Sequence, residues 1–397
     1  MISLQRYQDL FAVPELRATV ASSIAGRLPI GIAGLAILLF VQSRSASFAL
    51  AGTASALYVL GLGLVAPFLG RLIDRLGPHP VLSVCAVLYP AALTALAVLV
   101  LMSAHAAWVC VTAVLAGATL PPISACIRAL YPKLVNDPAL LHTAYSVDSA
   151  VVEAVFILGP AIVAVCVAAG QPQAAVLLAA LSAAAGTVFF MRAPPVRRWV
   201  AAPPRTHRDW AGVLRYPKLV LVFGIAFLYA FAFGLFELAV TAHASSKGSP
   251  AAAGIALALA SLGSGAGAFV YGARHWRSPL KVQFVVALVM MAAGILLLVP
   301  IEDLKLYAAA NVVAGVPMAT VIATQSLLVS QLAPRERLAE SFTWSATCLL
   351  VGISAGIAAG GALAEWVEAY WLLVAAAAST ALAAMVAATC ITSDEKE

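Results

Sequence analysis

The chain has 397 residues, and its mean hydropathy is +1.00. Of its residues, 63% are hydrophobic and 10% are charged, whereas a soluble globular protein has roughly 25% charged residues. So few charged side chains cannot cover a water-facing body, and the length leaves no room for a sizeable soluble domain beside the apolar segments. The composition therefore excludes an ordinary soluble protein and indicates that lipid surrounds most of the chain.

Twelve apolar runs follow one another, each near the roughly 20 residues that a membrane-spanning helix needs. Backbone polar groups must bond within the segment in lipid, and the runs do not alternate as the strands of a membrane barrel do. We therefore expect an all-α membrane protein with 12 transmembrane helices. The polar first 17 residues do not have the pattern of a cleaved signal. The runs lie near 18–41, 48–70, 80–102, 107–130, 142–169, 174–191, 218–241, 251–272, 281–300, 305–330, 339–363 and 370–391.

Lysine and arginine are distributed unevenly between the two sides of these spans. With the N-terminus placed in the cytoplasm, 19 of the 23 lie on or beside the cytoplasmic side, Arg128 among them. This bias predicts a multi-pass protein of the bacterial inner membrane with both termini cytoplasmic, and membrane lipid as a partner. It also accounts for the net charge of +6, so no nucleic-acid partner is expected. The four exceptions are Arg27, Arg44, Lys247 and Lys305.

A proline-containing polar stretch at 192–217 follows the sixth run and is predicted to be a cytoplasmic linker. It separates an N-terminal six-helix bundle, 1–191, from a C-terminal six-helix bundle, 218–397. The bundles share a weak repeat, because several glycines recur about 200 residues later, as parallel repeats in transporters do. The matched pairs are Gly31 and Gly234, Gly61 and Gly263, Gly63 and Gly265, Gly70 and Gly272, and Gly159 and Gly356.

A short motif stands between the second and third runs and reads Gly70-Arg71-Leu72-Ile73-Asp74-Arg75-Leu76-Gly77. It resembles the loop signature of the major facilitator superfamily in both spacing and position. The resemblance implies two pseudo-symmetric bundles around a central cavity, and transport by alternating access. It also implies that Gly70, Arg71, Asp74, Arg75 and Gly77 form a conformational latch. Asp74 could accept hydrogen bonds from the amino end of a facing helix or pair with an arginine.

Two glycine motifs lie within later spans. Span 5 carries Gly159-Pro160, which is similar to part of the signature of drug:proton antiporters, although the subfamily stays open. Span 11 carries Gly352, Gly356 and Gly360 at a spacing of four residues, which is typical of a face where helices pack closely or slide.

Charges within the spans are functional candidates, because burying a charge in lipid is expensive. Arg27 in span 1 and Asp148 in span 5 have similar depths, and we predict an ion pair between them. Glu153 lies five residues further on, roughly 140° around the helix. The second half has Ser345 and Leu350 at the equivalent positions. Asp148 and Glu153 are therefore candidates for proton coupling with Arg27 tuning them, and a purely structural ion pair is the alternative.

Further side chains within the spans are candidates for lining the cavity, with packing as the alternative role. Glu237 could bind a cationic group or reach the outer membrane interface. The full set is Glu237, Tyr145, Phe233, Asn311, Gln325 and Trp344.

The function expected is proton-coupled secondary transport of a small organic molecule, with export in exchange for protons favoured over uptake with protons. The alternative hypothesis is a channel or a non-transporting membrane sensor. No Walker-type loop and no metal-ligand spacing occur, so the proton gradient is the expected energy source and no cofactor is expected. The hydrolase-like pattern Gly352-Ile353-Ser354-Ala355-Gly356 lies in an apolar run with no strand before it, so no enzyme is expected. A monomer is expected.

Overall fold

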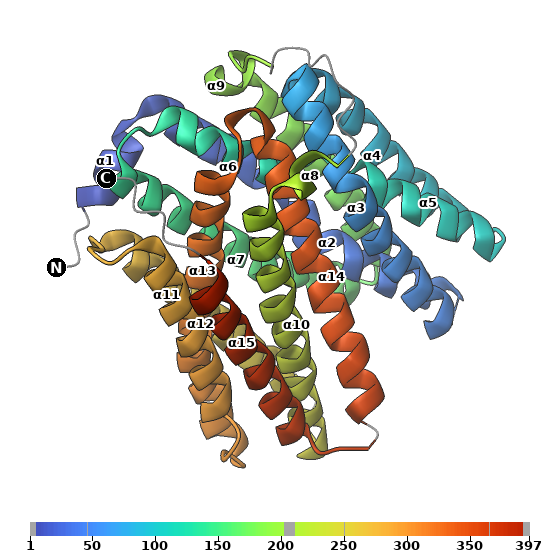
Figure 1. Ribbon diagram of the computed structural model, residues 1–397. Helices are drawn as coiled ribbons and strands as arrows, with labels where there is room; N and C mark the ends of the chain where they lie inside the picture. Colours follow the sequence, from blue (N-terminus) through green and yellow to red (C-terminus); the bar gives the residue numbers. More distant parts are fainter. Residues whose placement is uncertain (1–4, 46, 202–210, 250, 365, 392–397) are drawn as a thin grey trace.

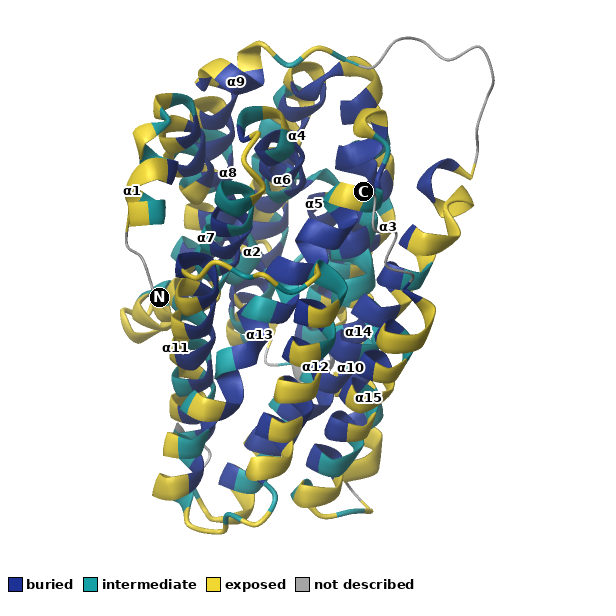
Figure 2. Ribbon diagram, turned by 60° about the vertical axis from the view of Figure 1, so that its left-hand side comes forward, coloured by how far each residue is buried: buried dark blue, intermediate teal, exposed yellow. Residues whose placement is uncertain are grey.

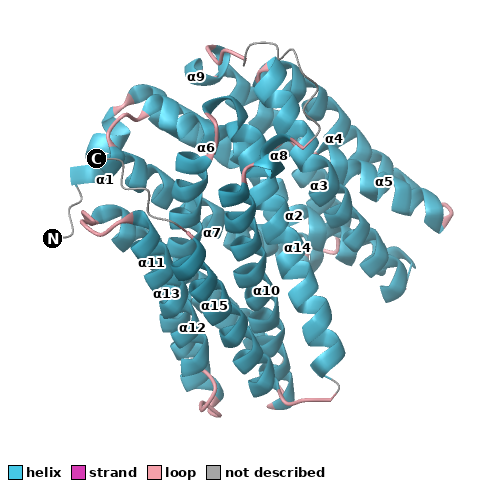
Figure 3. Ribbon diagram, viewed as in Figure 1, coloured by secondary structure: helices cyan, strands magenta, loops and turns pink. Residues whose placement is uncertain are grey.

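The computed structural model describes residues 5–45, 47–201, 211–249, 251–364 and 366–391. Within these ranges the chain forms helices and no strand (Figure 3). Twelve segments there are long and apolar enough to cross a membrane, as the sequence predicts. In the first half they are α2 (Pro14–Ser45), α3 (Phe48–Leu76), α4 (Pro78–Leu101), α5 (Ala106–Thr119) with α6 (Ile123–Leu134), α7 (Pro138–Ala168) and α8 (Pro172–Arg192). In the second half they are α10 (Pro217–Ser246), α11 (Ala251–Ala273), α12 (Leu280–Leu297), α13 (Leu304–Leu332), α14 (Leu338–Ala364) and α15 (Ala369–Cys390).

Short helices lie outside these spans. They are α1 (Gln5–Ala12), α9 (Pro194–Arg197) and the 3-10 turns η1 (Gly212–Arg215) and η2 (Arg335–Arg337). Both α9 and η1 belong to the predicted linker, of which residues 202–210 lie outside the described ranges.

The fourth span is not the single helix expected from the run at 107–130. It is interrupted between α5 and α6, because Pro121 and Pro122 have no backbone N–H to continue the helix. The second part, α6, then begins at Ile123 and carries Arg128 and Tyr131 into the interior. The break therefore decides which polar side chains of this span are buried.

The outer surface of the spans is apolar. Large hydrophobic side chains such as Phe68, Val87 and Leu181 are well over half exposed, and exposed residues cover the outward faces of the helices (Figure 2). A soluble monomer rarely exposes contiguous apolar surface on this scale, so this belt is the surface that lipid covers.

Two sets of helices pack mainly within themselves, α2 to α8 and α10 to α15. The sets meet where α3 contacts α14, and where α7 contacts α11 and α13 (Figure 1). We name the end of the bundle that carries Gly77, α9 and η2 the basic end; it lies at the top of Figure 1.

Glycine contacts follow the predicted repeat. A methyl group on Gly159 would overlap the backbone of Gly31, and one on Gly234 would crowd Gly356, so α2 packs on α7 as α10 packs on α14. The glycine face of α14 is a packing face, because Gly352, Gly356 and Gly360 all lie against α10. Pro160, one residue after Gly159, is inside α7 and exposed.

Candidate functional site

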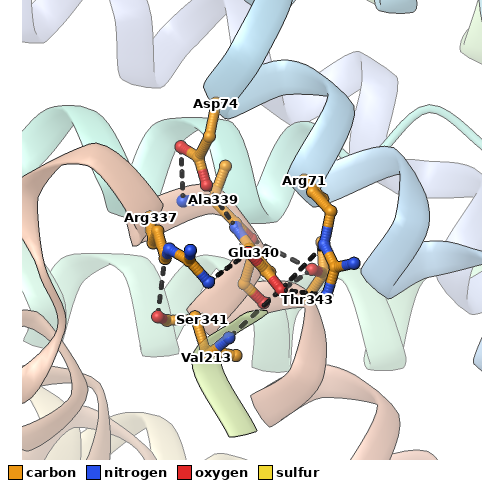
Figure 4. A network of polar contacts seen from close by, with 8 residues as sticks. All are labelled: Arg71, Asp74, Val213, Arg337, Ala339, Glu340, Ser341 and Thr343. Atoms are coloured by element: carbon orange, nitrogen blue, oxygen red, sulfur yellow. Dashed lines mark hydrogen bonds and ion pairs between the residues drawn. The ribbon is translucent and has the colours of Figure 1, made fainter. Parts of the chain in front are cut away.

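Asp74 links the two sets of helices at the basic end. Its Oδ1 accepts a hydrogen bond from the amide of Ala339 at 3.1 Å, and its Oδ2 accepts one from the amide of Glu340 at 2.8 Å (Figure 4). These amides are among the first of α14, where a helix leaves N–H groups without partners and its dipole favours a negative charge. Of the two partners expected for Asp74, the structure shows the amino end of a facing helix.

Glu340 is the centre of a second contact in the same place. Its Oε1 accepts from Arg71 Nη2 at 2.7 Å and from the backbone amide of Val213 at 3.2 Å, while Arg337 Nη1 lies 3.9 Å from its Oε2 (Figure 4). One buried carboxylate therefore joins α3, α14 and the linker turn η1. Glu340 is not among the residues predicted from the sequence, although an acidic residue in the first turn of an apolar run is a signal that could have indicated it.

The two glycines of the motif have separate structural reasons, a close approach of two helices at Gly70 and a turn at Gly77. A methyl group on Gly70 would overlap Thr343 and Ala339 of α14, so α3 can lie this near only with glycine there. Gly77 has a φ of 82°, which allows the chain to turn directly from α3 into α4. Arg75 is exposed and lies outside this network.

A buried triad joins α2, α6 and α7. Arg27 Nη2 lies 2.5 Å from Asp148 Oδ1, and Arg128 Nε lies 2.6 Å from Asp148 Oδ2. The hydroxyl of Tyr131 also donates to Oδ1, at 3.3 Å. The side chains of Arg27, Arg128 and Asp148 are 2%, 8% and 1% exposed. The predicted ion pair between Arg27 and Asp148 is present, and a second arginine shares the same carboxylate.

The sequence counted Arg128 among the basic residues on or beside the cytoplasmic side and predicted no partner for it. It is 6% exposed and points inward, because the break before α6 sets the register of that helix. The adjacent prolines were the available signal.

Tyr145 belongs to the wall of the triad. Its hydroxyl donates to the backbone oxygen of Arg128 at 2.9 Å, and its ring meets that of Tyr131 edge-on at 5.3 Å. The same ring lies 6.1 Å from that of Phe342 in α14. Tyr145 therefore stands between the buried charges and the opposite set of helices.

Glu153 contacts the opposite set of helices directly. Its Oε1 accepts a hydrogen bond from Ser264 Oγ in α11 at 2.9 Å, and Ser264 Oγ in turn accepts from the amide of Ala319 in α13 at 2.9 Å. Among the described residues no cationic side chain lies within ion-pair distance of this carboxylate. The two acidic residues of α7 thus have different surroundings, one paired with arginines and one with a hydroxyl.

A neutral cluster occupies the corresponding place in the second half. Gln325 Nε2 donates to Ser345 Oγ at 2.8 Å, and the hydroxyl of Tyr229 donates to Gln325 Oε1. Ser345 is the repeat equivalent of Asp148. At these equivalent places the first half therefore carries charges, and the second half carries uncharged hydrogen-bonding groups.

The other candidates for the cavity are not joined to the triad by any hydrogen bond or ion pair in the described ranges. Asn311 is fully buried and donates to the Tyr307 carbonyl at 2.8 Å, while its Oδ1 has no partner. Trp344 Nε1 is buried without a partner. Phe233 packs on Phe236 at 6.0 Å. Glu237 is partly buried, far along α10 from the basic end.

Comparison with known proteins shows which family has this architecture. The sequence model of the Major Facilitator Superfamily matches residues 19–241 and 222–397. The chain belongs to the major facilitator superfamily. The resemblance carried by the loop motif is thereby confirmed, as is the expected fold, while the subfamily stays open. Members of this superfamily are membrane transporters rather than enzymes in general, and this chain is a multi-pass member with 12 apolar helices in its described part.

An uncharacterized MFS-type transporter from Sinorhizobium fredii, y4rN, is 33% identical over 192 residues, which is 47% of this chain and 44% of that protein. The matched segment thus spans less than half the length of this relative.

Solved structures share the fold. The human organic anion transporter MFSD10 has a TM-score of 0.76 and 18% identity, with 94% of this chain and 99% of that chain covered. A bacterial homologue of the iron transporter ferroportin, in an outward-facing state, has a TM-score of 0.75 and 16% identity over 94% and 98% of the two chains. The Escherichia coli fucose:proton symporter has a TM-score of 0.66 and 11% identity over 96% and 98%. At these identities the likeness shows the fold alone.

Proposed function

We propose that this protein is a proton-coupled secondary transporter of a small organic solute, and that Glu153 binds the proton. The observation that carries the proposal is the position of this carboxylate. It is partly buried at the interface between the two sets of helices, with a hydroxyl of the opposite set as its partner. An isolated buried carboxylate favours its neutral form, and contact with water favours the charged form. When the two sets of helices move apart and together, Glu153 would gain and lose contact with water. It would therefore release and bind a proton in each cycle.

The contacts between the sets support an alternating-access mechanism. Hydrogen bonds and ion pairs between them involve Asp74, Arg71, Glu153 and Thr143, together with Thr347, whose hydroxyl donates to Gly63. All lie from the middle of their helices toward the basic end, and in Figure 1 the opposite ends of α3 and α14 lie apart. We assign this arrangement to the state that is closed at the basic end. If the two sets of helices moved apart at the basic end, the contacts of Asp74 and of Glu153 would break together.

The orientation in the membrane follows from the distribution of positive charge. Short loops rich in lysine and arginine remain in the cytoplasm. We propose that the basic end is cytoplasmic in a bacterial inner membrane, with both termini on that side. The state closed at the basic end then faces outward.

Two couplings are compatible with proton movement into the cell. Export in exchange for protons is favoured by the partial signature at Gly159-Pro160. Uptake together with protons is the second candidate, and the triad favours it: two arginines share one carboxylate, so a proton on Asp148 adds to a positive charge that an incoming solute could balance.

The experiment uses purified protein in liposomes that contain a pH-sensitive dye. Organic anions, cations and neutral compounds are first screened for those that raise the unfolding temperature of the protein. A concentration gradient of each such solute is then applied across the liposome membrane. We expect the wild-type protein to move protons with the solute, in a direction that separates exchange from co-transport. Glu153→Gln keeps the hydrogen bond to Ser264 and should bind solute without moving protons.

Glu237→Gln, a second acidic residue within a span but far from the interface contacts, is the matched control and should keep the coupling. Undiminished proton movement by Glu153→Gln would refute the assignment. Solute flux that does not saturate and needs no proton gradient would instead indicate a channel.

A further inference from the structure

The triad contains more positive than negative charge. Arg27 and Arg128 are both buried, and Asp148 is the one carboxylate within ion-pair distance of either among the described residues. Burying an unbalanced charge is expensive, because the charge leaves water without a full partner. A structural ion pair needs only one arginine. The second cation is the feature that calls for an explanation.

The guanidinium of Arg27 also retains an unused donor. Its Nη2 binds Asp148, but its Nε is buried and has no hydrogen-bond partner in the described structure. Buried polar atoms without partners are rare in folded proteins. A planar guanidinium presents its donors as a fork that matches carboxylate and phosphate oxygens. Arg27 therefore has both the charge and the free donor to bind an anionic group.

Among the described residues, the side chains around the triad supply no second anion. The facing cluster of the second half, Tyr229, Gln325 and Ser345, is neutral. Glu153 is engaged with Ser264 of α11. A bound anion would supply the missing negative charge.

We infer that the transported solute is a small organic anion whose carboxylate or phosphate group binds Arg27 and Arg128. The inference rests on the proposed transport function and names its substrate class. The neutral donors and acceptors of Tyr229, Gln325 and Ser345 would face the remainder of the molecule. Access requires the sets of helices to part at Tyr145 and Phe342, whose rings now separate the triad from α14.

The charge count also bears on the coupling. Besides the proton on Glu153, a second proton taken from water onto the carboxylate of Asp148 would release both guanidiniums to the solute anion, and bound anion would in turn favour that protonation. Proton and solute then reinforce one another's binding. An anionic solute therefore selects co-transport over exchange.

The test is ligand-induced thermal stabilisation of the purified full-length protein in detergent. The anionic probes are succinate, benzoate and glycerol phosphate, and their neutral matches are succinamide, benzamide and glycerol. We expect at least one anion, and not its neutral match, to raise the unfolding temperature. A succinate or benzoate effect assigns a carboxylate, and a glycerol phosphate effect assigns a phosphate.

The key variant is Arg27→Gln, which leaves Arg128 and Asp148 as a balanced pair and should therefore fold. Affinity for the anion should fall by about tenfold or more, the worth of one charge-assisted hydrogen bond. Arg27→Lys keeps the positive charge but not the forked donors of a guanidinium, so its affinity for the anion should fall less than that of Arg27→Gln. Arg75→Gln, at an exposed arginine outside both the triad and the Glu340 network, is the control for a general effect of removing an arginine.

The inference is overturned if no anionic probe stabilises the protein, if only neutral or cationic compounds do, or if Arg27→Gln binds the anion as tightly as wild type. Anion binding together with unchanged proton movement in Glu153→Gln would leave the substrate class standing and reject the proton-coupling proposal.

Discussion

Asp148 is the single counter-charge for two buried arginines in the part of the chain that the structure describes, so its removal has a larger effect than removal of either partner. Asp148→Asn leaves both guanidiniums without a carboxylate, and breaking a buried pair in this way typically costs about 3–5 kcal/mol. Arg27→Gln leaves one balanced pair. We expect thermal unfolding in detergent to rank the variants with Asp148→Asn far below Arg27→Gln and wild type. Equal unfolding temperatures for the two variants would show that the second arginine does not depend on this carboxylate.

Of the two arginines that contact Asp148, one contact could be predicted from the sequence and the other could not. Matching depths along two helices predicted the contact between Arg27 and Asp148, because a helix rises by a fixed distance per residue. The register of a helix after a break is not fixed in this way. The contact of Arg128 with Asp148 was therefore not predicted, because it depends on how the turn at Pro121 and Pro122 directs α6.

At the scale of one helix, two glycines of α11 that are two residues apart have opposite surroundings. A methyl group on Gly263 would overlap the carbonyl of Val312 in α13, whereas one on Gly265 would meet nothing within 4 Å. Gly263→Ala should therefore destabilise the protein by about 1–3 kcal/mol through overpacking. Gly265→Ala should be neutral or slightly stabilising, because alanine favours the helix. Thermal unfolding of the two variants provides the comparison, and similar losses for both would contradict the packing described for α11.

The amino-terminal helix α1 ties the first set of helices to α11. Arg6 Nη1 donates to the carbonyl of Arg274 at 3.0 Å, and the Tyr7 hydroxyl donates to the carbonyl of Phe269 at 2.7 Å. Burial raises the pKa of Tyr7 to about 12. The folded state thus holds this proton more tightly than the unfolded chain, and the resulting stabilisation is complete below pH 10 and lost only as the pH rises toward 12.

Tyr7→Phe keeps the stacking on Phe269 but removes the donor. Loss of one hydrogen bond should lower stability by about 0.5–1.5 kcal/mol, and by the same amount at every pH between 6 and 9. Thermal unfolding across this range checks both statements. A difference from wild type that varies over that range would mean that the Tyr7 hydroxyl does not act as a constant donor.

At the scale of the whole molecule, the sequence predicted the twelve spans and the superfamily, because both depend on local composition and on one short motif. The partners that hold the two sets of helices together depend on positions hundreds of residues apart. Glu340 is an example, since it contacts Arg71 and Val213, and no local pattern connects these three. The glycine repeat did carry long-range information, because equivalent glycines mark equivalent helix crossings in both halves.

The balance between the two access states should depend on Asp74, since its carboxylate binds the amino end of α14 only when the basic end is closed. Asp74→Asn keeps one acceptor oxygen but loses the charge that the helix dipole favours, a change worth about 0.5–2 kcal/mol. By the relation between free energy and population, the state open at the basic end should become roughly 2- to 30-fold more populated. Cys126 of α6 is buried and close enough to Asp74 for the two groups to interact electrostatically, and its rate of alkylation is the measurement of that opening.

Arg75→Gln is the matched control, because Arg75 belongs to the same motif but is exposed and outside the network. It should leave the alkylation rate unchanged. Faster alkylation of Cys126 in Asp74→Asn alone would establish that the contact with α14, rather than the charge of the loop, holds the basic end closed. Equal rates in both variants and wild type would show that closure depends instead on the contacts of α7 with α11, where Thr143 donates to the carbonyl of Gly272 at 2.8 Å.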